Sequence, residues 1–475
     1  MEGVRAVADR LSPLDASFLY VEEPTTPMHV GSVAVFEEPK DGFDHDRLVD
    51  LISERIAFVP RYRQRVRDVP GHVANPVWVD DENFDIGYHV RRSALPRPGN
   101  DEQLFELVAR VQGRPLDRAR PLWEMYLVEG LSEHRFAVIT KTHHAMVDGI
   151  GAVDIGQVIL DTNPAPARPK SRKGAVLDAW QPEPEPSWAE LIVGAVTDTV
   201  RRPTAALDTL RGGLSEVRSS AGRLLGAASG LFAAGLTVAR PAPGSPLNVV
   251  VSGQRRFASV ATDLDDYRTI RKAHGGTVND VVLAAIAGAL RAWLLTRAES
   301  VSTATVVRAM VPVSVQDDDE SGRAGNRVSS YLVDLPVGEP SPVMRLHQVS
   351  YRMKGHNETG QAVGAESLVG LAGFAPPTLH ALGARAASSM SKRWFNLVVT
   401  NVPGPQLPLY VGGSRMLASY PVVPLAKTQA VAIGLTSYDG QVFYGINADR
   451  DAMPDIDVLA QCIVDAVAEL VESVR

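Results

Sequence analysis

The chain has 475 residues, which is enough for two or three domains of roughly 100–200 residues each. Its hydrophobic share of 45% and its charged share of 22% are ordinary for a globular protein and can supply a sizeable core. The net charge of -7 argues against a nucleic-acid-binding protein, which normally carries a basic face.

The single cysteine, Cys462, leaves no partner for an intramolecular disulfide and excludes a cysteine zinc cluster. It lies in the apolar helical pattern of residues 457–474, so we expect a core residue rather than a nucleophile. Residues 1–15 lack the apolar stretch of a secretory signal. These features predict a protein of the reducing cytoplasm.

The first 160 residues predict a mixture of helices and strands. Residues 29–36 alternate like a half-buried strand, and residues 44–59 have helical spacing. Residues 100–112 predict a second helix with Asn100 or Asp101 as its N-cap. Residues 135–144 form a predicted strand that leads into a pair of histidines.

The middle of the chain changes in composition near Asn163, where proline-rich, charged segments indicate a linker. Residues 188–240 follow as a long helical stretch with several arginines and an uncharged run from Leu224 to Ala239. That run is shorter than the roughly 20 residues needed to span a bilayer. Two alternatives are a helical hairpin packed on its own protein and a helix lying on a membrane or lipid-droplet surface.

A second globular half begins near Pro246. Residues 277–297 predict its strongest helix, with a Thr/Asn start. Strand patterns follow at 304–315, 327–337, 394–404 and 429–449, with a hairpin turn at Tyr438–Gln441, and a helix at 457–474 ends the chain. Strands and helices alternate in both halves, so we predict two α/β layers of related size.

The paired histidines end the predicted strand at 135–144. Side chains alternate along a strand, so His144 shares a face with Thr142, while His143 shares the other face with Lys141. The two imidazoles would then point to opposite sides, which makes a shared metal ion a weak reading.

Other readings of this stretch differ in strength. A phosphate loop fails because Asp154 stands where its last glycine should be. No GxSxG occurs, which argues against a serine hydrolase. A general base at a strand end fits, because much of an ordinary histidine is neutral near pH 7. From the residues alone, a satisfied core histidine is an equal alternative.

Residues 143–149 match HHxxxDG, the motif of the CoA-dependent acyltransferase superfamily. Further blocks resemble the bacterial wax ester synthase/diacylglycerol acyltransferase family in the same order along the chain. They are residues 11–32, Pro121-Leu122-Trp123 within 115–131, Asn279-Asp280 within 277–284, and the blocks 324–337 and 400–413. The resemblance covers nearly the whole chain except about 163–245, and five ordered blocks are far more specific than HHxxxDG alone.

The resemblance implies an α/β (α+β) fold of two chloramphenicol acetyltransferase-like subdomains. Each would be a mixed sheet with flanking helices, and the two would surround a central channel. We expect the N-terminal subdomain at 1–162, a linker and helical, membrane-contacting segment at 163–245, and the C-terminal subdomain at 246–475.

The resemblance also implies a reaction: acyl transfer from a long-chain acyl-CoA to diacylglycerol or a long-chain alcohol, with no cofactor beyond the acyl-CoA co-substrate. His144 would be the general base and His143 structural. Asp148 would hold the loop in place, with a second catalytic acid as the alternative. Gly149 would let the chain turn and bring backbone amides near the reacting oxygen.

The remaining blocks have less specific expected roles, in packing or in shaping the active site. Asn279 and Asp280 begin a helix, so capping and shaping of the active site are equal alternatives. Pro121, Leu122 and Trp123 would pack in the core or line the channel. A rigid turn is expected at Asn401, Pro403 and Gly404. In related folds such a segment borders the interface between the two halves.

Two rival functions stay open. One is a non-catalytic lipid-binding relative, against which the intact HHxxxDG speaks. The other is an acyltransferase of the same superfamily that acts on another hydroxyl or on an amine. We expect a cytoplasmic protein without nucleic acid or metal, peripheral on the inner face of the membrane or on lipid droplets through 188–240.

Overall fold

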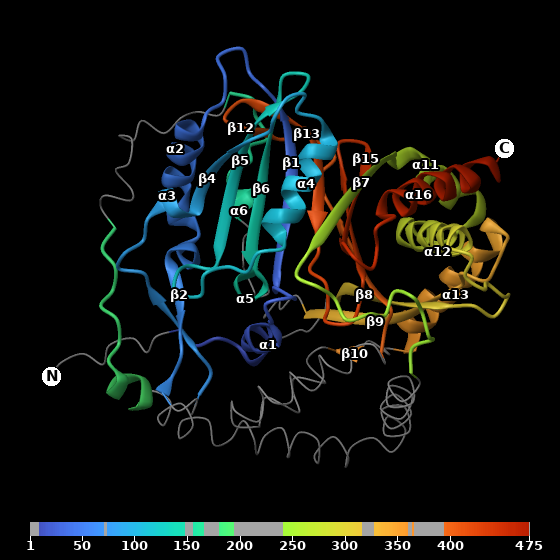
Figure 1. Ribbon diagram of the computed structural model, residues 1–475, viewed down its shortest axis with the longest axis horizontal. Helices are drawn as coiled ribbons and strands as arrows, with labels where there is room; N and C mark the ends of the chain where they lie inside the picture. Colours follow the sequence, from blue (N-terminus) through green and yellow to red (C-terminus); the bar gives the residue numbers. More distant parts are fainter. Residues whose placement is uncertain are drawn as a thin grey trace.

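The computed structural model describes residues 9–70, 74–147, 155–165, 180–193, 241–315, 327–359, 363–364 and 394–474. Within these ranges the chain forms two sheet-containing halves that lie side by side (Figure 1). A two-stranded sheet of β2 (Gln64–Arg67) and β3 (Val77–Asp80) accompanies the first half.

The first half is built around a six-stranded sheet with the order β12-β13-β1-β6-β5-β4. Its helices and 3₁₀ turns are α1 (Pro13–Val21), α2 (His45–Arg55), η1 (Ile56–Phe58), η2 (Pro60–Arg63), α3 (Ile86–His89), α4 (Asp101–Gln112), α5 (His144–Val147) and α6 (Ile155–Val158). Its strands are β1 (His29–Glu37), β4 (Val90–Ala94), β5 (Trp123–Leu131) and β6 (Arg135–His143), with β12 (Tyr410–Val411) and β13 (Ser414–Val422).

The two faces of this sheet are covered by different helices, as the period of two along each strand requires. Val33, Ala137 and Ile139 pack with Leu104 and Val108 of α4 in one cluster. The alternate strand residues, including Phe36 and Val138, pack with the apolar side of α2 in another cluster. The sheet is therefore buried on both faces.

The second half has a seven-stranded sheet with the order β10-β9-β8-β11-β14-β15-β7. Its strands are β7 (Arg255–Asp263), β8 (Val307–Val315), β9 (Arg327–Leu335), β10 (Val363–Gly364), β11 (Leu397–Pro403), β14 (Val431–Tyr438) and β15 (Gln441–Asp449). Its helices are α11 (Leu264–His274), α12 (Val278–Thr296), α13 (Pro342–Thr359) and α16 (Ile456–Glu472).

Helix α12 is the central helix of the second half. Among the described residues it alone is long and apolar enough to cross a membrane by length and composition. Most of it is nevertheless buried, and its side chains join a cluster with residues of α16 and of the sheet. Its apolarity therefore serves the core of the second half.

The C-terminal part of the chain adds a strand pair to the first sheet. β12 and β13 come from the last quarter of the chain, yet β13 pairs antiparallel with β1 at the edge of the first sheet. Figure 1 shows these late, orange strands beside the blue β1. The range 246–475, predicted as the C-terminal subdomain, thus contributes strands to both sheets, and the predicted division stays a prediction.

Several predicted elements appear with small boundary differences. Asn100 caps α4 with a capping box, because its side chain accepts from Gln103 N and the Gln103 side chain accepts from Asn100 N. The predicted hairpin turn joins β14 to β15 through Asp439 and Gly440, both with positive φ, which suits a type I′ turn. The helix predicted at 44–59 ends at Arg55 and continues as a 3₁₀ turn.

Candidate functional site

The two histidines lie where β6 ends and α5 begins. The strand stops at His143, one residue earlier than predicted, because α5 begins at His144. His144 N still donates to Met28 O at 2.9 Å, in register with the pairing of β1 and β6. His143 N donates to Leu122 O at 2.9 Å. The backbone of the pair is therefore fixed from two sides, by the segment before β1 and by the segment before β5.

His143 lies on the face of β6 that α4 covers, since Ala137 and Ile139 pack there with Leu104 and Val108. It is completely buried, and its Nδ1 accepts from Ala145 N at 3.1 Å. Burial, followed by nearby Arg118 and His144, lowers the pKa of His143 to about 3. The ring is thus neutral at pH 7, which fits its predicted structural role.

His144 opens α5 and is only partly buried. Its ring stacks on Phe18 of α1, with centroids 4.5 Å apart and planes at 15°. Burial lowers the pKa of His144 to about 4, so the imidazole is neutral at pH 7 and can accept a proton. Nδ1 is enclosed and makes no hydrogen bond to the described residues, which leaves Nε2 as the nitrogen that can act on a bound molecule.

A clamp formed by Glu22 and Arg118 holds α1 against this site. Arg118 donates through Nε and Nη2 to Glu22 Oε2 at 3.0 and 2.6 Å, and through Nη2 to Leu19 O at 2.7 Å. Glu22 Oε1 accepts from Met28 N at 3.1 Å and lies 3.7 Å from His143 Nε2. The clamp joins the end of α1, the residue that binds His144 N, and the segment before β5.

Sequence reasoning missed α1, Phe18 and the Glu22–Arg118 clamp. A signal for the helix was present, because Ser12 precedes Pro13 at the first helical position and its side chain accepts from Asp15 N at 3.0 Å. The contacts with His144 and Arg118 join residues about a hundred positions apart, and no local pattern contains them.

Pro121, Leu122 and Trp123 are buried directly before and at the start of β5. Leu122 supplies the carbonyl that binds His143 N. Trp123 Nε1 donates to Tyr62 O at 2.8 Å, and the ring stacks on His89 with centroids 4.6 Å apart. These contacts give the element a packing role close to the site.

Asn279 and Asp280 sit at the start of α12, where a capping box explains Asp280. Its carboxylate accepts from Thr277 N at 2.8 Å and from Ser350 Oγ at 3.0 Å, while Asp280 N donates to Thr277 Oγ1 at 3.1 Å. Asn279 Oδ1 accepts from Asn401 Nδ2 at 3.2 Å. Two blocks that lie far apart in the sequence therefore meet in the second half.

A cavity of about 910 Å³ lies at this meeting point. Asn279, Asp280, Asn401 and Pro403 line it together with residues of β8 and α13. His143 and His144 are not among its lining residues. Gly404 is explained by close packing, because a Cβ there would overlap the carbonyl oxygen of Ser437. The roles predicted for these residues stay predictions.

Asp148 and Gly149 lie outside the described residues, as does most of 188–240. Their predicted roles as loop holder, tight turn and membrane contact therefore stay predictions. Within the described residues, no three His, Cys, Asp or Glu side chains gather in a way that could hold a metal ion.

Comparison with known proteins identifies the family of the chain. The model of the wax ester synthase/diacylglycerol acyltransferase catalytic domain matches residues 11–282, and that of the WS/DGAT C-terminal domain matches residues 324–471. The probable diacylglycerol O-acyltransferase tgs2 of Mycobacterium tuberculosis is 34% identical, with 98% of this chain and 99% of that protein covered. The shorter probable diacylglycerol O-acyltransferase tgs3 of the same organism is 46% identical over 55% of this chain and 95% of its own length.

Solved structures agree. The wax ester synthase/diacylglycerol acyltransferase from Marinobacter aquaeolei VT8 is 28% identical, with a TM-score of 0.66 over 98% of this chain and 99% of that one. The first condensation domain of the calcium-dependent antibiotic synthetase shares the fold, with a TM-score of 0.58 at 17% identity over 98% of this chain and 96% of that one. The predicted fold class and family are confirmed: the chain belongs to the wax ester synthase/diacylglycerol acyltransferase family.

Proposed function

We propose that the protein transfers a long-chain acyl group from acyl-CoA to the hydroxyl of diacylglycerol or of a long-chain alcohol, with His144 as general base. The observation that supports this most is the state of His144. It is neutral at pH 7, partly exposed, stacked on Phe18, and held at the end of β6 by a backbone hydrogen bond. A fixed neutral imidazole is suited to removing a proton from an alcohol.

In the proposed reaction the acceptor oxygen attacks the thioester carbonyl while His144 Nε2 takes the hydroxyl proton. A new C–O bond forms, and the C–S bond then breaks. The imidazolium returns its proton to the leaving sulfur, which departs as the CoA thiol. No acyl-enzyme intermediate is required, and the only cysteine, Cys462, is buried in α16 with a pKa raised by burial.

The low pKa of His144 has a mechanistic consequence. An ordinary histidine is about half protonated at pH 6.5, whereas His144 keeps its base form well below that pH. The base is therefore fully available near pH 7. The burial that lowers its pKa also makes it a weaker base. Orientation of the imidazole toward the acceptor hydroxyl and exclusion of water must therefore contribute to the rate enhancement.

The proposal is tested with purified protein, palmitoyl-CoA, and either dipalmitin, hexadecanol or hexadecylamine. We expect acceptor-dependent release of the CoA thiol and formation of the matching ester. Ester with dipalmitin or hexadecanol supports the lipid reaction, whereas amide formation alone supports the rival acceptor class. Lipid binding without thiol release under any condition would contradict the proposal and favour a non-catalytic lipid-binding protein.

Phe18 is expected to position the base. Replacing Phe18 with Ala removes the ring that stacks on His144, so we expect kcat to fall roughly tenfold because part of the orientation is lost. Phe18→Tyr keeps an aromatic ring and should restore most of kcat. Leu14→Ala, a change on the same helix, is the control. Equal losses of kcat in Phe18→Ala, Phe18→Tyr and Leu14→Ala would contradict a positioning role.

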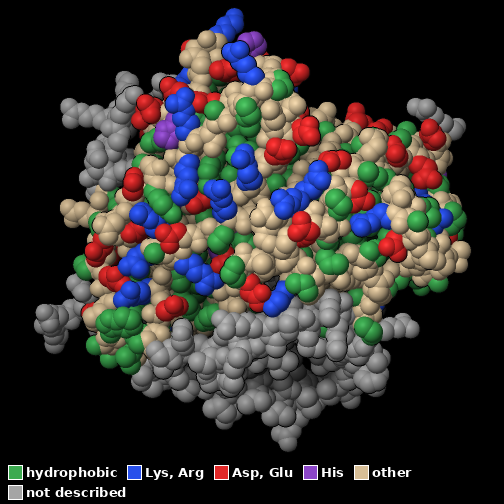
Figure 2. All heavy atoms as spheres, viewed as in Figure 1, with side chains coloured by type: hydrophobic (Ala, Val, Ile, Leu, Met, Phe, Trp, Pro, Cys, Tyr) green, Lys and Arg blue, Asp and Glu red, His purple; other side chains and the backbone are tan. Residues whose placement is uncertain are grey.

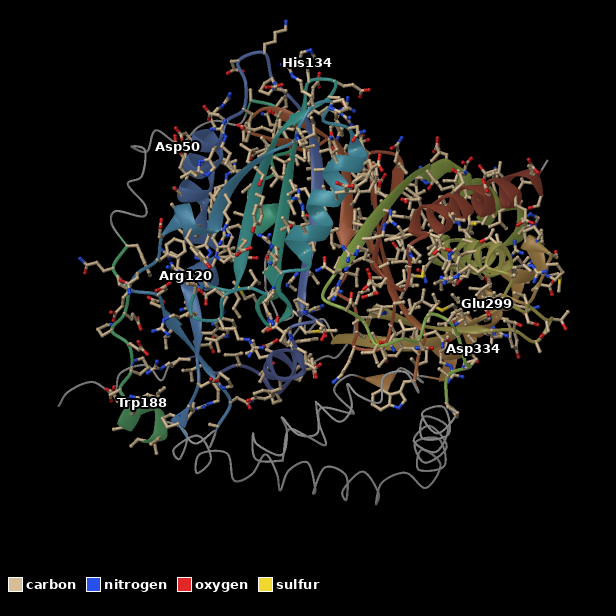
Figure 3. The ribbon with its side chains drawn as sticks, in the orientation of Figure 1. Asp50, Arg120, His134, Trp188, Glu299 and Asp334 are labelled. Carbon is tan, nitrogen blue, oxygen red and sulfur yellow. The ribbon has the colours of Figure 1, made fainter. Side chains whose placement is uncertain are left out.

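We further propose that a cytoplasmic pool of the protein docks on the inner membrane face or on lipid droplets through 188–240. The start of this segment is described, and Trp188, Ile192 and Val193 are 58%, 43% and 62% exposed there. Figure 3 shows Trp188 at the lower edge of the first half. Exposed aromatic and aliphatic residues next to a basic, apolar stretch favour a lipid surface.

Flotation with liposomes that contain anionic lipid tests this docking. We expect the full chain to float with the vesicles, and a variant with Trp188, Ile192 and Val193 changed to Ser to float several-fold less. Equal flotation of the variant, and of a chain lacking 188–240, would contradict it.

A further inference from the structure

A groove of about 1370 Å³ lies between the two halves, and none of the site residues predicted from the sequence lines it. Its walls are α4 and the turn after it on one side, and β7 with the exposed side of α16 on the other. In Figure 1, α4 and β7 face each other on the viewed side, and Figure 2 shows Lys and Arg side chains over this boundary. The groove is thus open to solvent and formed by both halves.

Arginine is the dominant charged residue of the groove. The arginines that line it are Arg110, Arg114, Arg255, Arg256 and Arg450, against the acidic residues Glu102, Glu106 and Asp457. The whole chain carries a net charge of -7, so this local excess of positive charge runs against the protein as a whole. Such a reversal marks a surface that attracts anions.

The arginines differ in how far they are engaged. Arg255 is buried and donates to Ser252 O at 2.6 Å and to Thr25 O, so it is structural. Arg256 lies 3.5 Å from Asp457. Arg110 and Arg114 are exposed, and no hydrogen bond or ion pair of their guanidinium groups is found among the described residues. These two cations are available to a ligand.

One end of the groove adjoins the histidine site. Gly113, Arg114 and Pro115 line the groove directly after α4. The preceding residue, Gln112, supplies the carbonyl that binds His29 Nε2 at 2.7 Å, and His29 is paired with His143 across β1 and β6. Paired residues of adjacent strands are only about 5 Å apart. The arginine end of the groove is therefore linked through Gln112 and His29 to His143, the residue that precedes the proposed base.

From these observations we propose that the groove binds the phosphate-bearing nucleotide of the CoA donor, with Arg110 and Arg114 on its phosphates. This rests on the proposed acyl-CoA reaction. The thioester must reach His144, while the nucleotide at the other end of the donor carries the negative charge. Guanidinium groups bind phosphate with two parallel hydrogen bonds, which suits exposed arginines at the rim of a groove. The pantetheine arm would run from this rim toward the histidine site.

The test is the kinetics of Arg110→Ala/Arg114→Ala with three palmitoyl donors of decreasing charge. They are palmitoyl-CoA, palmitoyl-3′-dephospho-CoA, and the palmitoyl thioester of N-acetylcysteamine, which lacks the nucleotide. We expect KM for palmitoyl-CoA to rise about tenfold or more, with kcat little changed. The rise should be smaller for the dephospho donor and absent for the N-acetylcysteamine thioester.

Arg271→Ala/Lys272→Ala is the matched control, because it removes two exposed positive charges from α11, outside the groove. It should leave all three KM values unchanged. An equal rise in KM for the uncharged thioester, or an equal effect of the control, would overturn the proposal. Absence of turnover by the wild type with every donor would refute the acyl-transfer reaction itself. An active wild type whose KM for palmitoyl-CoA does not change in Arg110→Ala/Arg114→Ala would refute only the role of the groove.

Discussion

Replacing His144 with Ala is expected to lower kcat for acyl transfer by roughly a thousandfold, within the 10²–10⁴ range typical of a lost general base. Nothing among the described residues can replace it, because His143 is buried and engaged with Ala145 N. The effect should fall on kcat, since the proton is transferred only as the acceptor attacks. Steady-state kinetics with palmitoyl-CoA and dipalmitin measure it, and thermal melting checks that the variant is folded.

Two further observations separate the base from its neighbour. His143→Gln should retain far more activity than His144→Ala, because the Gln side chain can also accept from Ala145 N. The wild-type kcat/KM should be flat between pH 5.5 and 8, because the pKa of His144 is about 4. A profile that falls to half near pH 6.5, or a His144→Ala variant with near-normal kcat, would contradict this assignment.

The free energy of unfolding is expected to fall by at least about 4 kcal/mol when the pH drops from 7.5 to 5. His89 and His143, both completely buried, supply that amount, because burial lowers their pKa values to about 4 and about 3. His29 and His144, whose pKa values are also lowered by burial, add to the loss. An unfolded histidine with a pKa near 6.5 takes up a proton over this interval and the folded one does not. The unfolded state therefore binds more protons, and stability is lost as the pH falls through 6.5.

His89 and His143 each contribute about 2 kcal/mol to this change. Urea denaturation at several pH values measures it. A His89→Phe variant is the control, because it keeps an aromatic ring between Phe84 and Trp123 but cannot titrate. The variant should lose about 2 kcal/mol less than wild type between pH 7.5 and 5. An unfolding free energy that does not change with pH in either protein would show that these histidines are not held neutral by burial.

Local patterns predicted those parts of the fold that depend on neighbouring residues. The capping box of α4 needs only Asn100 and Gln103, and the β14–β15 turn needs only Asp439 and Gly440. The alternation of β6 placed His143 with Lys141, and its two faces indeed pack in different clusters. These contacts span a few residues, so composition and period contain them.

Contacts between distant residues account for what the sequence did not reveal. Phe18 contacts His144, and Arg118 contacts Glu22, although the members of each pair are about a hundred residues apart. No helix or strand periodicity in the sequence relates residues at such distances. The pairing of β13 with β1 brings together strands that are about 400 residues apart in the sequence. The groove lined by Arg110 and Arg114 forms only where α4 of the first half faces β7 of the second half. The histidine motif could be recognised from the sequence. The side chains that position His144, and the burial that keeps its imidazole uncharged, depend on the folded arrangement.

The stoichiometry of acyl transfer tests most directly whether His144 acts as the general base of a direct transfer. Wild-type protein would be incubated with labelled palmitoyl-CoA and dipalmitin, and both the CoA thiol and the triacylglycerol would be quantified. Direct transfer with His144 as base predicts one triacylglycerol for each thiol released, no protein-bound acyl group after gel filtration in denaturant, and neither product with His144→Ala. Thiol release without ester, or unchanged ester formation by His144→Ala, would contradict it.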